Sequence, residues 1–178
     1  MRLFVAIDLP WELRAQLALL AWRGIPGARW VPAENLHLTL RFIGETQGWQ
    51  ADEIDHALAA LRGRAFPLTL AGVGTFAKAG RVTQLWAGVE RSPPLEHLQA
   101  KIETALQRAG LAPERRRFVP HVTLARLDNA AETKLAGFVQ QHNLFRAEPI
   151  AVEHFTLFSS RLGKEQAACV AEVEYPLG

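Results

Sequence analysis

The sequence is poor in cysteine, in long apolar runs and in net charge. Cys169 is the one cysteine among 178 residues, so the chain cannot form an internal disulfide, and we expect a reducing, cytoplasmic setting. The apolar run at residues 3–7 is too short for a signal sequence, and no run reaches the roughly 18 apolar residues that a membrane-spanning helix requires. Twenty Lys and Arg residues against 18 Asp and Glu leave a net charge of +2, which excludes a protein that coats nucleic acid through charge alone.

Several common catalytic motifs are also absent. The sequence has no P-loop and no Gly-x-Ser-x-Gly motif, and a single cysteine excludes a cysteine-based zinc ribbon. Residues 72–77 faintly resemble a dinucleotide-binding loop, but turn-like residues follow them in place of the helix that such a loop requires. The composition, 49% hydrophobic and 21% charged, is that of a globular domain that needs no disulfide or metal to support its core.

Strand and helix patterns occur twice along the chain in the same order. Apolar residues at helical spacing predict helices that begin at Pro10 and after Ser92, and further helices over residues 52–62 and 130–142. Short apolar or alternating runs predict strands at residues 3–7, 35–43, 67–76, 83–89, 121–126, 148–160 and 168–175. We expect an α+β fold, with one domain over residues 1–178. It would consist of two pseudo-symmetric lobes, residues 1–78 and 81–162, and a final strand at residues 167–176.

Within this repeat the same short motif stands in both halves. His-Leu-Thr-Leu begins at His37 and His-Val-Thr-Leu begins at His121, 84 positions later. Residues i and i+2 of a strand lie on one face, so each histidine projects together with its threonine while the aliphatic residues face the core. A pseudo-two-fold arrangement would bring the two polar faces together across one groove.

Two imidazoles and two hydroxyls on one groove suit acid–base chemistry at a phosphate. Because an unperturbed imidazole titrates near pH ~6.5, one ring can accept a proton from a nucleophile while the other donates one to the leaving group. The hydroxyls of Thr39 and Thr123 can donate to the non-bridging phosphate oxygens. The two histidines could instead bind Zn²⁺, but no other histidine stands at a metal-ligand spacing from them, so a distant carboxylate would have to supply the third ligand.

The two motifs and the segments around them resemble the two-histidine (2H) phosphoesterase superfamily. Residues 35–44 and 120–126 are similar to its two signature segments, residues 2–10 to its N-terminal start, and residues 155–160 to its late strand. The resemblance spans nearly the whole chain and is greatest to the bacterial and archaeal RNA 2′,3′-cyclic phosphodiesterases, also called 2′-5′ RNA ligases. It implies a bilobal fold in which each lobe is an antiparallel sheet backed by helices and the active site lies in the central cleft.

The resemblance also implies a reaction in RNA processing and its participants. A hydrolase of this family opens a 2′,3′-cyclic phosphate at an RNA end, leaves a 2′-phosphate and frees the 3′ oxygen. The same site could join the cyclic end to a 5′-hydroxyl of RNA, which would form a 2′-5′ linkage. Matching these residues to the family's motifs implies that His37 is the proton donor, that His121 is the proton acceptor, and that Thr39 and Thr123 hold the phosphate. Pseudo-symmetry leaves the opposite assignment of the two histidines open. We expect no metal, no cofactor, no membrane contact and no obligatory protein partner, and a monomeric enzyme.

Two arginines that follow the motifs are candidates for contacting the substrate. Strict alternation places Arg41 on the face of His37, where it would contact phosphate or RNA. Arg126 is similar to the arginine that follows the family's second motif. It is five residues beyond His121, however, and reaches the same face only if the strand ends or bulges after Leu124.

A basic cluster and two aromatic residues complete the candidate set. Arginines fill positions 115–117 just before the second motif, and we expect them to guide an RNA strand, with Arg117 assigned to substrate binding. Phe4 and Trp30 are candidates for stacking on the terminal base, because every base offers a π-face. Phe42 is a weaker candidate, because strict alternation assigns it to the core.

Two other functions remain as alternatives. A non-catalytic RNA-binding module would need cations but not a matched pair of histidines and threonines. A phosphodiesterase for small cyclic nucleotide phosphates, or for ADP-ribose cyclic phosphate, would keep both motifs and differ only in pocket size and loop contacts. If the histidines act as acid and base, kcat/KM should have a bell-shaped dependence on pH with one limb for each histidine.

Overall fold

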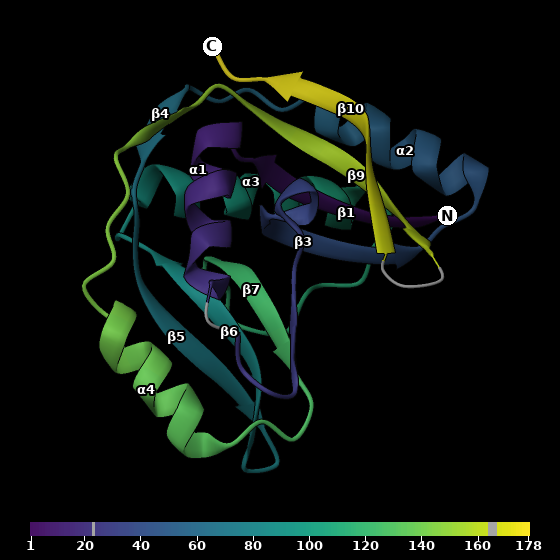
Figure 1. Ribbon diagram of the computed structural model, residues 1–178. Helices are drawn as coiled ribbons and strands as arrows, with labels where there is room; N and C mark the ends of the chain where they lie inside the picture. Colours follow the sequence, from purple (N-terminus) through teal and green to yellow (C-terminus); the bar gives the residue numbers. More distant parts are fainter. Residues whose placement is uncertain (23, 164–166) are drawn as a thin grey trace.

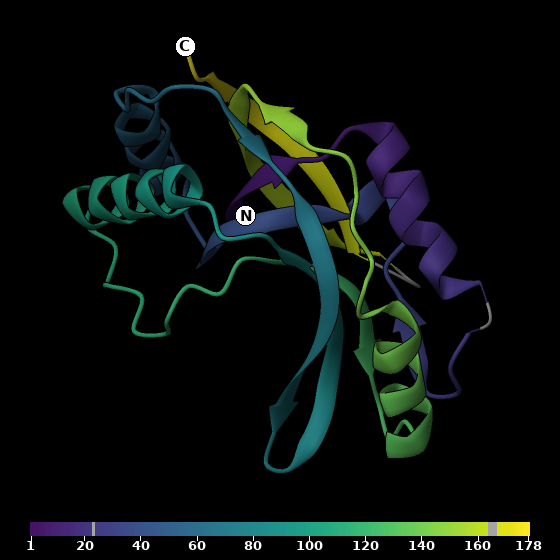
Figure 2. The same cartoon turned by 90° about the vertical axis from the view of Figure 1, so that its left-hand side faces the viewer.

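Two four-stranded antiparallel sheets form the framework of the protein (Figure 1, Figure 2). The computed structural model describes residues 1–22, 24–163 and 167–178. The first sheet contains, in spatial order, β10 (Ala167–Pro176), β9 (His154–Leu162), β1 (Arg2–Asp8) and β3 (His37–Glu45). The second contains β2 (Ala28–Trp30), β7 (His121–Leu127), β6 (Arg81–Val89) and β5 (Leu70–Lys78). A third, two-stranded sheet pairs β4 (Phe66–Leu68) with β8 (Ile150–Val152).

In the described part of the chain four α-helices pack against these sheets, and local sequence signals explain where α3 begins and ends. They are α1 (Trp11–Ala18), α2 (Gly48–Ala59), α3 (Pro93–Arg108) and α4 (Glu132–His142), with short 3₁₀ turns at Leu19–Ala21 and Ala33–Asn35. The Ser92 hydroxyl caps α3 by accepting a hydrogen bond from the amide of Leu95. Gly110 follows the C-cap residue Ala109, and its positive φ lets the amide of Leu111 return to the carbonyl of Leu106. Among the described residues, no helix has both the length and the apolar composition to cross a membrane.

Strand β1 separates the main core from the opposite face of the first sheet, on which Phe4 and His37 lie and which is called the groove face below. Leu3, Val5 and Ile7 belong to the main core, which extends beneath both sheets and the helices. Phe4 and Ala6 point to the opposite face and pack with Phe158 in a small separate cluster. Both faces of this strand are therefore buried, and one of them carries an aromatic cluster rather than polar residues.

The two lobes are not contiguous halves of the chain, so the predicted division at residues 78–81 is corrected. Ala79 and Gly80 both have positive φ and form the two-residue turn of a hairpin that keeps β5 beside β6. The first sheet lacks β5 for this reason and obtains β9, which returns from the far end of the chain to pair with β1. The prediction of antiparallel sheets backed by helices is confirmed, but the halves exchange their last strands.

Helix α2 covers Gly48–Ala59 in place of the predicted residues 52–62, and the remaining differences from the predicted elements concern short or interrupted strands. The expected strand at residues 148–160 is divided at Glu153 into β8 and β9. The three-residue strands β2 and β4 were not predicted as separate strands, because three residues are too few to show a period. The last strand, β10, lies at the edge of its sheet, as expected.

Candidate active site

The two motif strands, β3 and β7, lie next to each other where the two sheets meet. In each strand the histidine and the threonine are only partly buried, whereas the two aliphatic residues of the motif are buried in the core. The predicted alternation therefore holds through Leu40 and through Leu124. It places the two His–Thr pairs at the junction of the sheets, on the face opposite to the main core.

Beyond Leu40 the alternation in β3 reverses. Thr39 and Arg41 pair with consecutive residues of β1, so Leu40 is an additional, bulged residue. Arg41 consequently turns into the core, where its Nε lies 2.7 Å from a carboxylate oxygen of Glu103. The predicted contact of Arg41 with phosphate or RNA is therefore wrong. Phe42 takes the position on the groove face instead, and 56% of its surface is exposed.

The same irregularity occurs in β7 and brings Arg126 to the histidines. Thr123 and Ala125 pair with consecutive residues of β6, so Leu124 is bulged and Ala125 fills the core. Arg126 is thereby moved to the face of His121 and is exposed. Its positive charge contributes to lowering the pKa of both motif histidines, which places all three side chains within electrostatic range of one another. Arg126 could reach the face of His121 only through an irregularity in the strand, and the bulge at Leu124 provides it.

Aromatic rings enclose His37. Its ring stacks on Phe4 with centroids 4.8 Å apart and on Phe158 with centroids 5.7 Å apart. This burial lowers the pKa of His37 to about 4, although a hydrogen bond to the backbone of Asn35 and the nearby carboxylate of Asp8 both act to raise it. His37 is therefore neutral at neutral pH when no anion occupies the groove.

Neither Phe4 nor Trp30 offers a ring face to a base, so the predicted stacking role is wrong for both. Phe4 is 4% exposed and lies in the ring stack with His37 and Phe158. Trp30 pairs with the core residue Ala125, on the core side of the second sheet, and its ring packs against Phe138 of α4 with centroids 5.7 Å apart. Phe42 is instead the exposed aromatic side chain on the groove face of β3.

His121 has a different setting, in which one ring nitrogen is fixed. Its Nδ1 lies 2.7 Å from the carbonyl oxygen of Val119. Because a carbonyl can only accept, Nδ1 carries the proton of the neutral ring and Nε2 keeps a free lone pair. The edge of the ring meets Phe76, with centroids 4.8 Å apart, and Trp86 lies beyond it. Burial lowers the pKa of His121, and the bond to Val119 opposes this.

One polar contact in the groove was missed by the sequence analysis. The hydroxyl of Thr123 donates a hydrogen bond to the side-chain carbonyl of Gln84, at 3.2 Å. Gln84 lies on β6 opposite Arg126. A weak signal is present in the sequence, because Thr83 and Gln84 are the two polar residues at the start of the strand predicted at residues 83–89.

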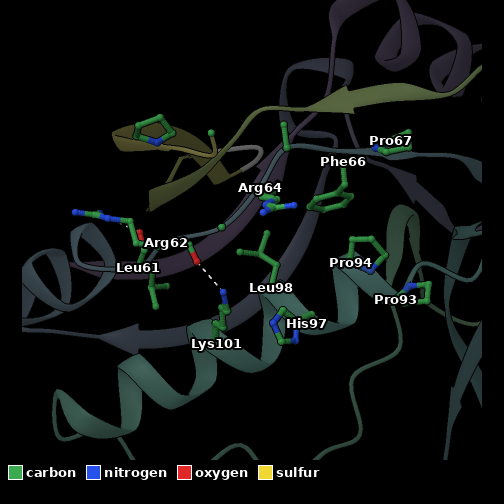
Figure 3. A pocket seen from close by; sticks show the side chains of 14 residues that line it. Leu61, Arg62, Arg64, Phe66, Pro67, Pro93, Pro94, His97, Leu98 and Lys101 are labelled. Atoms are coloured by element: carbon green, nitrogen blue, oxygen red, sulfur yellow. Dashed lines mark hydrogen bonds between the residues drawn. The ribbon is translucent and has the colours of Figure 1, made fainter.

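A large cavity elsewhere in the molecule is not part of this site. Its volume is ≈ 1130 Å³, and it lies between the end of α2, the strand β4 and the beginning of α3 (Figure 3). Among the lining residues that the structure describes, His97 is the one histidine and there is no carboxylate, so the cavity has no acid–base pair. Within the described ranges, no three His, Cys, Asp or Glu side chains gather where they could hold a metal ion.

The predicted basic cluster lies in a long connection that leads directly to His121. Residues 109–120 link α3 to β7 and extend away from the sheets (Figure 2). The three arginines at its centre, Arg117 among them, are exposed. Their proximity to the second motif fits the expected contact with RNA, which remains a prediction.

Comparison with known proteins assigns the family. The model of the 2′-5′ RNA ligase superfamily matches residues 11–164, and the chain belongs to this superfamily. A Thermotoga maritima relative named RNA 2′,3′-cyclic phosphodiesterase is 34% identical over 168 residues, which cover 91% of this chain and 88% of the relative. An Escherichia coli relative of the same name is 36% identical over 174 residues, which cover 92% of this chain and 89% of the relative. The crystal structure of E. coli LigT complexed with 3′-AMP superposes with a TM-score of 0.82 at 29% identity, over 99% of this chain and 97% of that one.

Proposed function

We propose that the protein hydrolyses 2′,3′-cyclic phosphates at RNA ends to 2′-phosphates. The observation that carries this proposal is the presence of both His–Thr pairs and of Arg126 on one face at the junction of β3 and β7. The names of the T. maritima and E. coli relatives support the choice of substrate. A module that only binds RNA would have no use for two imidazoles in defined environments, one of them held in a defined tautomer.

His121 is the proton acceptor in this reaction. The carbonyl of Val119 holds the proton on Nδ1, so Nε2 is free to remove a proton from the attacking water. Burial keeps the pKa of His121 below its ordinary value, so the ring is in the neutral, basic form at neutral pH. The water oxygen then forms the new bond to phosphorus.

His37 is the proton donor. Burial lowers its pKa to about 4, and an anionic phosphate beside the ring opposes this by favouring the imidazolium form, as the carboxylate of Asp8 does. The charged ring gives its proton to the 3′ oxygen as the bond between phosphorus and that oxygen breaks. The product carries the phosphate on the 2′ oxygen and a free 3′-hydroxyl.

The remaining side chains of the groove bind the substrate. Thr39 and Thr123 donate hydrogen bonds to the non-bridging oxygens, and the Thr123 hydroxyl leaves Gln84 to do so. Arg126 stabilises the negative charge that develops on phosphorus oxygens in the transition state. Phe42 stacks on the terminal base, and Arg117 contacts the strand that precedes it.

The same pair of histidines can catalyse a ligation, in which the cyclic phosphate is opened by an RNA end and not by water. If a 5′-hydroxyl of RNA replaces water, the neutral histidine removes its proton and the product has a 2′-5′ linkage, in agreement with the superfamily description. Hydrolysis dominates in dilute solution because water is far more concentrated than RNA ends. The absence of a metal, the monomeric state and the cytoplasmic location stay predictions.

The test is turnover of an RNA oligonucleotide that ends in a 2′,3′-cyclic phosphate, in the presence of EDTA. We expect a 2′-phosphate product and rate losses of about 10²–10⁴-fold in both His37→Ala and His121→Ala, the usual contribution of a general acid or base. His97→Ala, which changes a histidine in the cavity of Figure 3, is the matched control and should retain full activity. A loss of wild-type turnover in EDTA that Zn²⁺ restores would overturn the mechanism.

A further inference from the structure

Arg41, which the bulge in β3 turns inward, forms a buried ion pair with Glu103 of α3. Its Nε donates to Oε2 of Glu103 at 2.7 Å, and the two side chains are only 8% and 16% exposed. The other guanidinium nitrogens are also used. Nη1 donates to the carbonyl of Phe42 at 2.7 Å, and Nη2 donates to the carbonyl of Ala112 at 2.5 Å. One side chain therefore connects β3, α3 and the connection at residues 109–120.

Glu103 holds the same connection from the other side. Its carboxylate accepts hydrogen bonds from the backbone amide of Glu114 at 2.9 Å and from the side chain of Gln107 at 3.0 Å. Burial alone would raise the pKa of Glu103, but the hydrogen bonds from Arg41, the Glu114 amide and Gln107 outweigh it and lower the pKa to about 2. The carboxylate is thus ionised at every pH at which the protein would work.

The hydrogen bonds from Arg41 and Glu103 fix the backbone that leads into the exposed arginine segment, residues 115–117. Ala112 and Glu114 directly precede the segment 115–117, and Phe118, which packs against the main core, directly follows it. The carboxylate of Glu114 also accepts a hydrogen bond from the amide of Arg116 at 3.0 Å. The three arginines therefore project from a short loop whose two ends are anchored.

A buried ion pair of this kind determines geometry more than stability. Apolar side chains of equal volume often stabilise a protein as well or better, because two charges lose their hydration on burial. Arg41 and Glu103 instead impose hydrogen bonds in fixed directions on two backbone groups of the loop. Three adjacent arginines repel one another, and this loop keeps them in one place despite that repulsion.

We infer that Arg41 and Glu103 are positioning residues that hold the arginine loop, residues 115–117, in place to bind the RNA strand upstream of the cyclic phosphate. This inference rests on the proposed function, and deepens it by naming what binds the body of the substrate as distinct from its end. Arg41 and Glu103 take no part in the chemistry. Their effect reaches the substrate through the loop.

The test compares two substrates in wild type and in Glu103→Gln. One is an RNA oligonucleotide with a 2′,3′-cyclic phosphate end, and the other is a nucleoside 2′,3′-cyclic monophosphate, which has no upstream phosphates. We expect KM for the oligonucleotide to rise about tenfold with unchanged kcat, and its dependence on salt to become shallower, because phosphate contacts are lost. Both parameters for the mononucleotide should stay at the wild-type values. Arg41→Lys keeps the charge but loses the bond to Ala112, so its effect should be intermediate.

A second variant tests whether the effect passes through the arginines. In a protein with serine at positions 115–117, KM for the oligonucleotide should already be raised, and Glu103→Gln should raise it no further, because the two changes act on one contact. Trypsin should cleave at the arginines faster in Glu103→Gln than in wild type. Glu90→Gln is the matched control, because it breaks an exposed ion pair with Arg146 elsewhere and should change none of these results.

Three results would overturn the inference. They are a fall in kcat for the mononucleotide, an equal rise in KM for both substrates, and an additive effect in the serine background. If wild type hydrolyses neither substrate, the proposed function fails, while RNA affinity and trypsin cleavage still decide whether the ion pair positions the loop. If Glu103→Gln does not fold, the same measurements on Arg41→Lys decide it.

Discussion

The two motif histidines hold equivalent positions in the repeat but have different surroundings. His37 lies in a stack of phenylalanine rings, with Phe4 and Phe158 beside it. His121 meets Phe76 edge-on, and a backbone carbonyl fixes which of its nitrogens carries the proton. The backbone is therefore nearly symmetric around the groove, whereas the electrostatic environment is not. The two histidines therefore differ in proton affinity, and the positions of the attacking water and of the 3′ oxygen in the bound substrate assign donor and acceptor.

The bulges that follow the motifs show the same contrast. Each bulge moves the fifth residue after the histidine onto the groove face: Phe42 in one strand and Arg126 in the other. The fourth residue goes into the core in both strands, but Arg41 there requires an ionic partner and Ala125 does not. One copy of the motif thus presents an apolar ring to the substrate, and the other presents a positive charge.

Removing these two side chains one at a time should produce the largest difference in kinetics between the two lobes. Arg126→Met should lower kcat by about 10²-fold, because a cation beside the developing charge acts on the transition state. Phe42→Leu should leave kcat unchanged and raise KM about tenfold, because stacking on a base contributes about 1–3 kcal/mol to binding. Steady-state kinetics on the cyclic-phosphate oligonucleotide measure both. A loss of kcat in Phe42→Leu equal to that in Arg126→Met would show that the two positions are equivalent after all.

The pH dependence of kcat/KM and of kcat should distinguish the free enzyme from the enzyme with bound substrate. A rise in pH removes the proton from the acid histidine, and a fall in pH protonates the basic one, so the rate declines on both sides. In the free enzyme burial lowers both pKa values, that of His37 to about 4, so the maximum of kcat/KM should lie on the acid side of pH 6.5. The bound phosphate raises the imidazole pKa values, and the maximum of kcat should lie at a higher pH. Coinciding maxima would contradict this.

The smallest expected effect is on stability in weak acid. Unfolded His37 takes up a proton below about pH 6.5, whereas folded His37 does so only near pH 4. Its stabilising contribution is therefore complete above pH 6.5 and is lost as the pH falls towards 4, by up to about 3 kcal/mol. His37→Gln should lose correspondingly less stability between neutral pH and pH ~4.5 in urea unfolding. His121→Gln should differ less from wild type, because its ring is not enclosed in the same way; the reverse order would argue against the burial of His37 as the cause.

Sequence alone predicted the residues of the site better than their orientation. The two-residue period of a strand correctly predicted that each histidine lies on the same face as its threonine, for His37 with Thr39 and for His121 with Thr123. In a regular strand the position in the sequence determines the direction of the side chain. The bulges could not be predicted, because an extra residue in a strand depends on its pairing with a neighbour far away in sequence. One shift of register was enough to exchange the roles of Arg41 and Phe42.

The fold was predictable to a similar extent and for similar reasons. Helix ends had local signals, such as Ser92 before two prolines and Gly110 after the last apolar residue. No local signal in the sequence shows which strand pairs with which. The hairpin at Ala79 and Gly80 assigns β5 to the second sheet, and the repeat in the sequence could not show this because it records only the order of the elements.

The exchange of strands between the halves also governs how the protein reaches its folded state. Arg2 pairs with Ser160, so the first sheet joins residues from opposite ends of the chain, and contacts of such long sequence separation form slowly. During synthesis the strand β1 has to wait for β9, which is made long after it. The second sheet, whose β5–β6 hairpin is local, can begin to assemble earlier. The ring stack around His37 includes Phe158, so the surroundings of this histidine are complete only after β9 has left the ribosome.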